Sequence, residues 1–350
     1  MSEEVLLEVK NLKKYFPIKR GLFARTIGYV KAVDDVSFSI KKGETFSLVG
    51  ESGCGKTTTA RTILRAILPT EGDIILHIDE GAINLSTLNK KDEAILRRNA
   101  QMVFQNPFTS LNPRMKVKDI IGEPLLVNKV AKGRKLQEEV EKLMDTVGLR
   151  REYLIRYPHA FSGGQRQRIV IARALALKPK LVVLDEPVAA LDVSIRAQVL
   201  NLLMDLQEQF NLTYLFISHD LSVVEHISDR VAVMYLGRIV ELTDDKELFQ
   251  NPKHPYTEKL LEAVPIPDPQ KRAEQLKPLE GEVPDPANPP VGCYFHQRCP
   301  YVQDICIKEY PPIQNITNGE KEHLVACHFA SQLSLKGVKA TETLDFDERR

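Results

Sequence analysis

Short apolar runs recur along this chain, and polar residues follow each of them at once. Residues 45–49 (TFSLV) and 181–184 (LVVL) are runs of this kind, and a third run ends at Ile217. Continuous apolar runs of this length are typical of strands buried on both faces of a sheet. Residues 58–67 instead have the character of a helix, and residues 140–147 carry apolar side chains at helical spacing. The pattern predicts an α/β fold with chemically active residues at the strand ends.

A glycine-rich segment follows the first run. Its sequence, GESGCGKTT, fits the pattern G-x-x-x-x-G-K-[ST] and lies between a predicted strand and a predicted helix, the context that a phosphate-binding loop needs. Glycines let successive backbone N–H groups surround a phosphate, and the helix N-terminus adds its positive dipole end. A turn that binds nothing is the alternative, and the flanking elements disfavour it. The residues expected to bind a nucleoside triphosphate are Gly50, Glu51, Ser52, Gly53, Cys54, Gly55, Lys56, Thr57 and Thr58.

Within this loop, two side chains have specific expected roles. Lys56 would reach the β- and γ-phosphates, and Thr57 would hold Mg²⁺. Two acids end the second apolar run, because Asp185 directly follows LVVL and Glu186 comes next. We expect Asp185 to hold Mg²⁺, directly or through water, and Glu186 to polarise the attacking water. A strand that ends in ordinary solvated acids is the alternative, which the glycine loop makes less favoured.

The segment Ser162-Gly163-Gly164-Gln165 opens a predicted helix. Alone, it would be an N-cap with a nest of N–H groups for an anion. Together with the two elements above, FSGGQ resembles the LSGGQ signature of ABC transporter nucleotide-binding subunits, with Phe in place of Leu. The resemblance covers approximately residues 4–265. It implies a P-loop NTPase core with an antiparallel β subdomain, a helical subdomain at about residues 117–175, and an ATPase domain over residues 1–250.

Further site residues follow from the same resemblance. Gln105 resembles the glutamine of the family's Q-loop, which contacts Mg²⁺ and the attacking water and couples the site to the membrane partner. His219, after the third apolar run, resembles the switch histidine that contacts the γ-phosphate. Residues 190–192 (ALD) resemble the D-loop, which crosses the dimer interface. Val188 and Ala189 stand where many relatives carry Thr-Ser, outside the groups that do chemistry.

The resemblance also implies an aromatic residue that stacks on adenine near the N-terminus. Phe16 matches best by its spacing from the first strand, with Tyr15 beside it. Residues 17–30 look like an insertion, so Tyr29 is a rival for the same role. A Phe16 that only fills the core is an equal alternative.

In this family, two subunits meet head to tail, and each ATP lies between the glycine loop of one subunit and the signature of the other. The N–H groups at Ser162, Gly163 and Gly164 suit a γ-phosphate in this arrangement. Such a contact exists only while ATP is bound, so ATP joins the subunits and hydrolysis separates them. A homodimer and a pairing with a similar second ABC ATPase subunit both stay open.

The composition changes after Phe249. The segment His254-Pro255-Tyr256-Thr257 resembles one that follows the ATPase domain in oligopeptide and dipeptide importers, which implies two transmembrane permease subunits and, indirectly, an extracytoplasmic solute-binding protein as partners. Residues 251–335 would form a C-terminal module of that type, and residues 336–350 a charged, frayed tail. A linker in extended form is predicted by a run of prolines: Pro265, Pro267, Pro269, Pro278, Pro284, Pro286, Pro289 and Pro290.

Four of the five cysteines lie in this module, whereas Cys54 lies in the glycine loop. Clustered cysteines in a cytosolic chain favour a metal over disulfides, although the tight C-x₂-C pairs of many zinc sites are missing. Four thiolates suit a [4Fe–4S] cluster or Zn²⁺. The tail is similar to that of peptide-importer ATPases that hold a [4Fe–4S] cluster, which we favour; unliganded thiols are the third alternative. The proposed ligands are Cys293, Cys299, Cys306 and Cys327, and the histidines treated as bystanders are His296, His323 and His328.

Composition narrows the function further. The chain has 350 residues, 43% hydrophobic and 27% charged, and a formal net charge of +1. This small net charge therefore gives no general electrostatic attraction that would favour nucleic acid as a partner. No run of about eighteen apolar residues predicts a spanning helix, and the start, MSEEVLLEVKNLKK, differs from a secretory signal. We expect a peripheral subunit at the cytoplasmic face of the cell membrane.

The leading hypothesis is an ATPase subunit that powers the import of oligopeptides or dipeptides. Relatives in this branch also move oligosaccharides or nickel, so these solutes are alternatives. A soluble ABC ATPase of DNA repair or translation is less favoured. Such proteins usually carry two ATPase domains or a long coiled coil, whereas this chain has one glycine loop and one signature.

Overall fold

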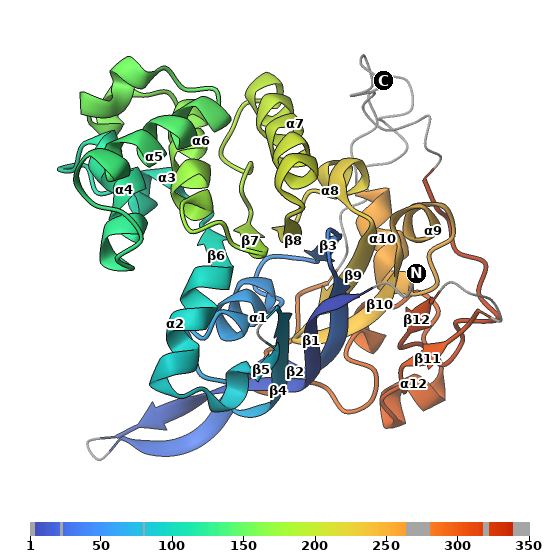
Figure 1. Ribbon diagram of the computed structural model, residues 1–350. Coiled ribbons are helices and arrows are strands. Elements are labelled where there is room, and N and C mark those ends of the chain that lie inside the picture. Colours follow the sequence, from blue (N-terminus) through green and yellow to red (C-terminus); the bar gives the residue numbers. More distant parts are fainter. Residues whose placement is uncertain (1–3, 22–23, 80, 264–280, 318–321, 339–350) are drawn as a thin grey trace.

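The computed structural model describes residues 4–21, 24–79, 81–263, 281–317 and 322–338. Within these ranges the chain forms two sheets covered by helices, the α/β arrangement that the sequence predicts (Figure 1). No helix in the described ranges is both long enough and apolar enough to cross a membrane.

The larger sheet carries the predicted strand ends. Its order is β11-β12-β10-β9-β3-β8-β7-β6; the last five strands are mutually parallel, and the first three continue the sheet in antiparallel fashion. Every residue of β3, β7 and β8 is buried, which explains their apolar sequences and confirms the three predicted strands. The strands are β3 (Thr45–Val49), β6 (Ala100–Val103), β7 (Leu181–Asp185), β8 (Thr213–Ser218), β9 (Arg230–Tyr235), β10 (Arg238–Asp244), β11 (Gln314–Asn315) and β12 (Leu324–Val325).

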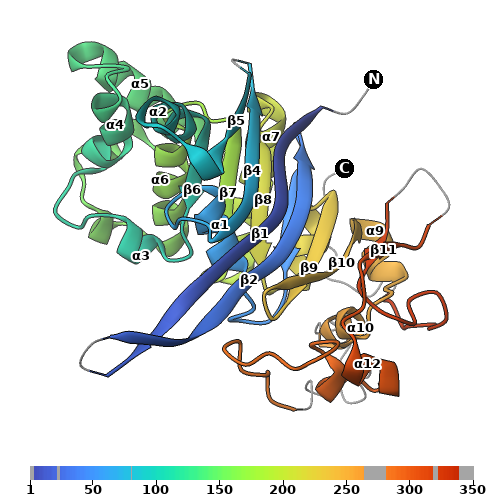
Figure 2. The ribbon, with the colours of Figure 1, turned by 90° about the horizontal axis from the view of Figure 1, so that it is seen from below.

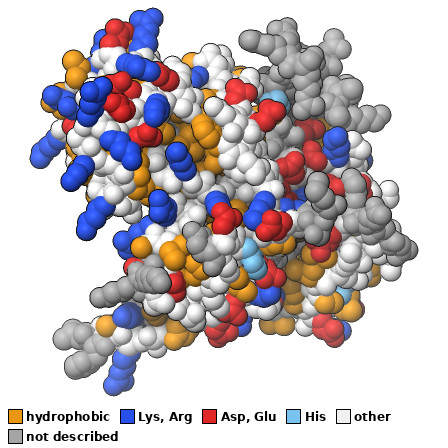
Figure 3. Space-filling view, viewed as in Figure 1, with side chains coloured by type: hydrophobic (Ala, Val, Ile, Leu, Met, Phe, Trp, Pro, Cys, Tyr) orange, Lys and Arg blue, Asp and Glu red, His pale blue; other side chains and the backbone are white. Residues whose placement is uncertain are grey.

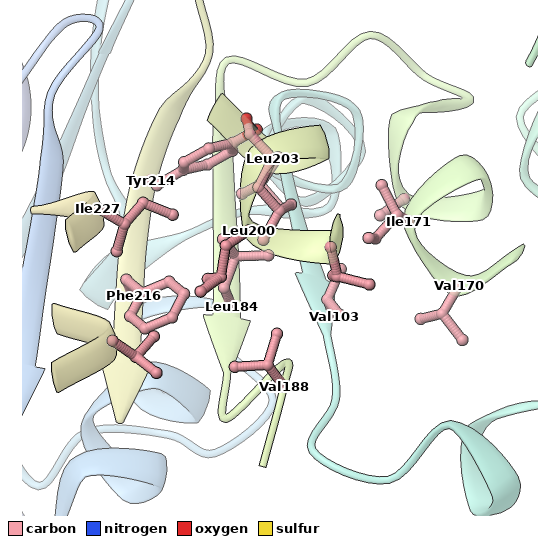
Figure 4. Close-up of a cluster of buried hydrophobic side chains, with 14 of the residues drawn as sticks. Val103, Val170, Ile171, Leu184, Val188, Leu200, Leu203, Tyr214, Phe216 and Ile227 are labelled. Carbon is pink, nitrogen blue, oxygen red and sulfur yellow. Dashed lines mark hydrogen bonds between the residues drawn. The ribbon is translucent and has the colours of Figure 1, made fainter. Parts of the chain in front are cut away.

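Helices cover both faces of this sheet. On one face, Leu200 and Leu203 of α7 share a buried cluster with Leu184 of β7 and with Tyr214 and Phe216 of β8 (Figure 4). On the opposite face, α1 shares a second cluster with both sheets. The α-helices are α1 (Lys56–Ile63), α2 (Lys90–Asn99), α3 (Pro107–Ser110), α4 (Val117–Val127), α5 (Gly133–Thr146), α6 (Gly163–Leu175), α7 (Val193–Phe210), α8 (Leu221–Ile227), α9 (Asp245–Gln250), α10 (Pro255–Glu262) and α12 (Asp304–Lys308). The 3-10 helices are η1 (Leu85–Thr87), η2 (Arg151–Ile155), η3 (Pro158–Ala160) and η4 (His296–Arg298).

The helix predicted over residues 58–67 is displaced towards the glycine loop. It begins at Lys56, directly after Gly55, which is its N-cap. It ends at Ile63 because Arg65 has a φ of 56°, outside the helical region. Leu68 precedes Pro69, a position that also disfavours helical backbone. The prediction of a helix was right, but its boundaries were wrong at both ends.

The smaller sheet is antiparallel, with the order β2-β1-β4-β5, as the family resemblance implies. Its first two strands form a long hairpin that projects from the body of the molecule (Figure 2). Residues 17–21 and 24–30 belong to the outer part of this hairpin, with Pro17 opposite Tyr29. Phe38 stacks on Phe46 of β3, with ring centroids 4.8 Å apart, and so joins the two sheets. The strands are β1 (Val5–Arg20), β2 (Arg25–Lys41), β4 (Glu71–Ile78) and β5 (Gly81–Asn84).

A group of helices, α3 to α6, lies beside the edge strand β6. Val140 and Met144 of α5 are buried, as their helical spacing predicts. Arg150 and Arg151, which follow α5, are exposed. Lys and Arg side chains are spread over this part of the surface in the upper left of Figure 3.

Residues 281–317 and 322–338, here called the C-terminal segment, attach to the core. β12 pairs with β10, with Val325 opposite Glu241, and so extends the larger sheet. The N–H of Lys31 in β2 donates to the carbonyl oxygen of Pro286 at 3.1 Å, so part of the predicted linker rests on the hairpin. Four predicted linker prolines and most of the predicted charged tail lie outside the described residues: Pro265, Pro267, Pro269, Pro278 and residues 339–350.

Candidate functional site

The loop between β3 and α1 is shaped by its glycines. Gly50 has a φ of 149°, and a Cβ there would lie 2.2 Å from the carbonyl oxygen of Met234 in β9. Gly55 has a φ of 114°, and a Cβ there would lie 2.2 Å from the carbonyl oxygen of Ala32 in β2. Backbone contacts therefore exclude a side chain at both positions. The two outer glycines of the motif are a requirement of the fold around the loop.

Lys56 and Thr57 begin α1 at the end of this loop. The Lys56 side chain is buried, and its Nζ donates to the carbonyl oxygens of Gly50 at 2.7 Å and Glu51 at 2.9 Å. Thr57 Oγ1 donates to Asp185 Oδ1 at 2.9 Å, so the two predicted Mg²⁺ ligands lie together. Burial raises the pKa of Asp185, and the hydrogen bond from Thr57 opposes that shift. The ammonium group of Lys56, the hydroxyl of Thr57 and the carboxylate of Asp185 are suitable groups for binding a nucleoside triphosphate with its Mg²⁺ ion.

The carboxylate of Glu186 contacts the other two side chains that are predicted to be catalytic, those of Gln105 and His219. Gln105 Nε2 donates to Glu186 Oε2 at 2.7 Å, and His219 Nδ1 lies 3.0 Å from Glu186 Oε1. The backbone of Glu186 has a φ of 48°, a left-handed conformation of the kind that is concentrated at functional sites. The three residues follow β6, β7 and β8, which are neighbours in the sheet, so the topology brings them together.

A pocket of about 330 Å³ opens beside these groups. It connects α1, the loop after β6 and the end of β7. A pocket of this size is within the range of small-molecule sites. Its lining residues are Arg61, Phe104, Gln105, Asn106, Thr109, Ser110 and Asp185.

The signature segment caps α6. Ser162 Oγ accepts from the N–H of Gln165 at 3.3 Å, and Gln165 Oε1 accepts from the N–H of Ser162 at 3.2 Å, a reciprocal capping box. A Cβ on Gly164 would lie 2.4 Å from Ile195 Cγ2 in α7, whereas one on Gly163 would meet Leu191 Cδ2 at 3.3 Å. Figure 1 shows α6 among the helices beside β6, apart from α1. Within one chain, the two predicted phosphate-binding elements therefore stand apart.

The candidate adenine-stacking residues lie on the hairpin. Phe16 is 37% exposed and Tyr29 51% exposed, so Phe16 is not a core residue. Tyr15 donates its hydroxyl proton to Asp34, which ties that ring to the core. Lys14 Nζ lies 4.9 Å from the ring centroid of Phe16. Phe16 and Tyr29 both stay available for the base.

The HPYT segment contacts the glycine loop. Burial lowers the pKa of His254 to about 3, so its ring is neutral, and Nδ1 accepts from the N–H of Tyr256 at 3.1 Å to cap α10. Tyr256 is fully buried, and its hydroxyl accepts from the N–H of Glu51 at 2.8 Å. This contact explains physically why a motif so far along the chain accompanies the ATP site.

Sequence reasoning missed a second contact with this loop. Arg298 Nη1 and Nη2 donate to the two carboxylate oxygens of Glu51 at 2.7 and 2.9 Å. The two residues are 247 positions apart, and nothing local in either segment indicates the pairing. The position of Arg298 directly before Cys299 is the one feature that could have drawn attention to it.

The four predicted cluster cysteines line one small cavity of about 20 Å³, and all are free thiols. Burial raises the pKa of Cys293 to about 12 and that of Cys299 to about 11. The N–H of Cys293 donates to the carbonyl oxygen of Cys306 at 2.8 Å, which joins two of the four segments. In the described part of the chain, no three or more His, Cys, Asp or Glu side chains are arranged to hold a metal ion.

The neighbouring histidines all have partners. His323 does not line the cavity, and its Nε2 lies 2.7 Å from Glu241 Oε1 in a buried pair. His296 and His328 line the cavity, and each ring contacts a backbone carbonyl oxygen, that of Cys293 at 2.8 Å and that of Glu309 at 3.0 Å. The donor chemistry suits iron or zinc, whereas the positions of the side chains do not form a metal-binding group.

Comparison with known proteins agrees with this geometry. A family model described as ABC transporter matches residues 33–189, and one described as the oligopeptide/dipeptide transporter C-terminal region matches residues 240–306. The oligopeptide transport ATP-binding protein AppF of Bacillus subtilis is 55% identical over 333 residues, which are 94% of this chain and 99% of that protein. The chain belongs to the ATP-binding proteins of oligopeptide and dipeptide ABC transporters. The dipeptide transport ATP-binding protein DppF of Escherichia coli is 48% identical, over 94% of this chain and 96% of that protein.

Solved structures of ABC ATPases share the fold of this peptide-transporter ATPase. The ATP-binding cassette MJ0796, in a dimeric post-hydrolysis state bound to ADP and phosphate, aligns with a TM-score of 0.59 and 27% identity, over 68% of this chain and 98% of that chain. Members of this family hydrolyse ATP and couple it to peptide transport, so the predicted peptide branch is confirmed. Oligosaccharide or nickel transport and a non-transport role are not favoured. The comparisons lend no support to an iron–sulfur group.

Proposed function

We propose that this ATPase hydrolyses ATP with Glu186 as the general base and so powers peptide import. The observation that carries the proposal is the double contact of one carboxylate, which receives Gln105 and His219 on its two oxygens. A general base must be held within reach of the attacking water, and two neighbours that orient it meet that need. Asp185 ends β7 directly before Glu186 and accepts a hydrogen bond from Thr57 of α1, and these two residues would supply the Mg²⁺ ligands.

The remaining groups bind and orient the nucleotide. Lys56 and the N–H groups of residues 50–58 receive the phosphates, and Phe16 or Tyr29 stacks on adenine. Gln105 would contact both Mg²⁺ and the attacking water. His219 contacts the γ-phosphate. Mg²⁺, when bound, neutralises phosphate charge.

The signature at residues 162–165 serves a second subunit. Its separation from α1 within one chain and the dimeric state of a solved relative support this role. We propose that this subunit pairs with a second ABC ATPase subunit, which is either another copy of this chain or a similar chain. The pair would bind two transmembrane permease subunits and would be linked through them to an extracytoplasmic solute-binding protein. The chain would dock at the cytoplasmic face of the membrane, with no nucleic acid as partner.

Uptake of a labelled short peptide tests the function. Cells that carry Glu186→Gln as the only copy of this subunit should take up no labelled peptide, while the permease subunits still co-purify with the variant. Unchanged peptide uptake in an assembled Glu186→Gln complex would contradict the proposal. The same cells would then be tested with labelled oligosaccharide and with nickel.

We further propose the division of the chain into an ATPase domain over residues 1–250, with a helical subdomain at about 117–175, and a Cys-rich C-terminal module over 251–335. The cavity shared by the four thiols supports a metal role for this module. Cys293, Cys299, Cys306 and Cys327 would be the ligands of a [4Fe–4S] cluster, with Zn²⁺ as the alternative. The group would have a structural or regulatory role.

The metal content of the protein decides between these alternatives. Chains purified without oxygen should carry about four iron atoms and four sulfides each, and Cys306→Ser should lose most of the iron. Stoichiometric zinc would replace the iron–sulfur assignment. A metal-free chain whose four thiols all react with a thiol reagent after unfolding would contradict any metal role. Cys54→Ser is the matched control, because this buried thiol lies outside the cavity.

A further inference from the structure

Arg298 of the C-terminal segment binds Glu51 of the glycine loop through two hydrogen bonds, a contact here called the clamp. Arg298 Nη1 donates to Glu51 Oε2 at 2.7 Å, and Nη2 donates to Oε1 at 2.9 Å. The Arg298 side chain is 3% exposed and the Glu51 side chain 26% exposed. A two-pronged pair of this kind fixes the direction of the carboxylate as well as its distance, and burial protects the pair from screening by salt.

The backbone of the same loop residue is held by the neighbouring element. The hydroxyl of Tyr256 in α10 accepts from the N–H of Glu51 at 2.8 Å. Phe295, three residues before the guanidinium, packs on Tyr256 and on Tyr235 of β9, with ring centroids 5.4 and 5.3 Å apart. Arg298 holds the side chain of Glu51 and Tyr256 holds its backbone, and both of these residues are connected to the cluster of Phe295, Tyr256 and Tyr235.

The segment that carries Arg298 is itself anchored to the core. Tyr294 donates its hydroxyl proton to Asp34 Oδ2 at 3.1 Å, and Asp34 is buried and pairs with Arg238 of β10 at 2.8 Å. The N–H of Arg298 donates to the carbonyl oxygen of Phe295 at 2.9 Å. These contacts hold the guanidinium in a fixed place relative to β2, β9 and β10, so it can act on the loop as a rigid support.

We propose that Arg298 is a positioning residue for ATP, which acts through Glu51 to hold the glycine loop in its nucleotide-binding form. The inference rests on the ATP site proposed above. A loop that is ordered in advance loses less conformational freedom when ATP binds. Without this ion pair, the loop is in its nucleotide-binding form for a smaller fraction of the time, and the apparent affinity for ATP falls with that fraction. The turnover of bound ATP is retained. The cysteine cavity is joined to the ATP site by one peptide bond, Arg298–Cys299, and one ion pair.

Direct attraction between the guanidinium and the phosphates would be a different mechanism, and the engagement of both Nη1 and Nη2 of Arg298 by Glu51 argues against it. If charge alone mattered, Glu51→Gln would remove a negative charge beside the phosphates and tighten ATP binding. If Glu51 must be held by Arg298, the same variant weakens ATP binding. Substitution of Arg298 or of Glu51 should then weaken ATP binding to the same extent, and the two effects should not be additive in a double variant.

The test is the ATPase kinetics of the assembled complex with Arg298→Ala, Glu51→Gln, the double variant and Arg298→Lys. Each of the first two should raise KM for ATP about tenfold with kcat changed less than about twofold, the loss expected when a charged hydrogen-bonded pair is removed. The double variant should match the single variants. Arg298→Lys should lie between them and the wild type, because Lys keeps the charge but not the two-pronged geometry.

The matched control is Glu322→Ala. It removes another ion pair between the C-terminal segment and the core, with Arg230 at 3.3 Å, and should leave KM unchanged. Tighter ATP binding in Glu51→Gln, additive effects in the double variant, or an unchanged KM in a folded Arg298→Ala variant would each overturn the inference. If Arg298→Ala fails to fold, Glu51→Gln decides, because it leaves the C-terminal segment intact. A wild-type complex without ATPase activity would instead contradict the proposed function itself.

Discussion

Glu186→Gln should lower ATP turnover about 10²- to 10⁴-fold while ATP binding is retained. The amide preserves the size of the side chain, but it cannot take a proton from the attacking water. Because hydrolysis separates the two subunits in the proposed cycle, the variant should also accumulate as an ATP-bound dimer. Steady-state phosphate release measures the first effect, and size-exclusion chromatography with ATP and Mg²⁺ measures the second.

A surface carboxylate provides the control for this prediction. Glu152 is exposed and lies in η2, away from the strand ends, so Glu152→Gln should keep wild-type turnover. Wild-type phosphate release by Glu186→Gln would show that another group activates the water. His219→Ala then becomes the next variant, because His219 contacts the same carboxylate.

Gly164→Ala should abolish most ATP-driven dimerisation and lower ATPase activity about 10²-fold, with ATP still bound at the glycine loop. The added Cβ would lie 2.4 Å from Ile195 Cγ2, and we expect α6 to shift away from α7 to relieve this contact. That shift displaces the signature residues at the N-terminus of α6, and a displacement of about 1 Å at a reacting group can cost this much. Overpacking also destabilises the fold by about 1–3 kcal/mol.

A second substitution distinguishes the clash from other causes. Ile195→Ala removes the Cγ2 atom that the new Cβ would meet, so the double variant should recover most of the lost ATPase activity. Gly28→Ala is the control, since its Cβ would meet Ile18 Cδ1 at an ordinary 3.7 Å. Wild-type activity in Gly164→Ala alone, or failure of Ile195→Ala to restore it in a folded protein, would show that contact with α7 does not position the signature.

The ATP site was predicted in detail because its parts are local. Each residue predicted to be catalytic or to bind phosphate lies at the end of one apolar strand or the start of one helix, and those elements are encoded by neighbouring residues. Parallel strands place their carboxyl ends on one edge, so Gln105, Glu186 and His219 could be expected together without knowledge of the fold. The structure adds the contacts, with both Gln105 and His219 on the carboxylate of Glu186.

Boundaries and long loops were harder to predict. The end of α1 at Ile63 depends on the left-handed Arg65, and no strong helix-stop residue indicates it. Residues 17–20 of β1 pair with residues 25–30 of β2 in the outer hairpin, and the side chains of these strands alternate too weakly to show that pairing in the sequence. The exposed position of Phe16, which excludes a core role, follows from this hairpin.

By itself, the sequence determined the α/β class and the peptide-transporter branch, and it predicted the nucleotide loop, the catalytic acids and the signature. All of these reside in contiguous motifs whose geometry is set by nearest neighbours. Only the tertiary structure decided that Tyr256 and Arg298 hold Glu51, and that the cysteines of four separate segments line one cavity. Contacts between residues 247 positions apart depend on how the whole chain packs, because a buried ion pair forms only where the fold excludes water around both partners.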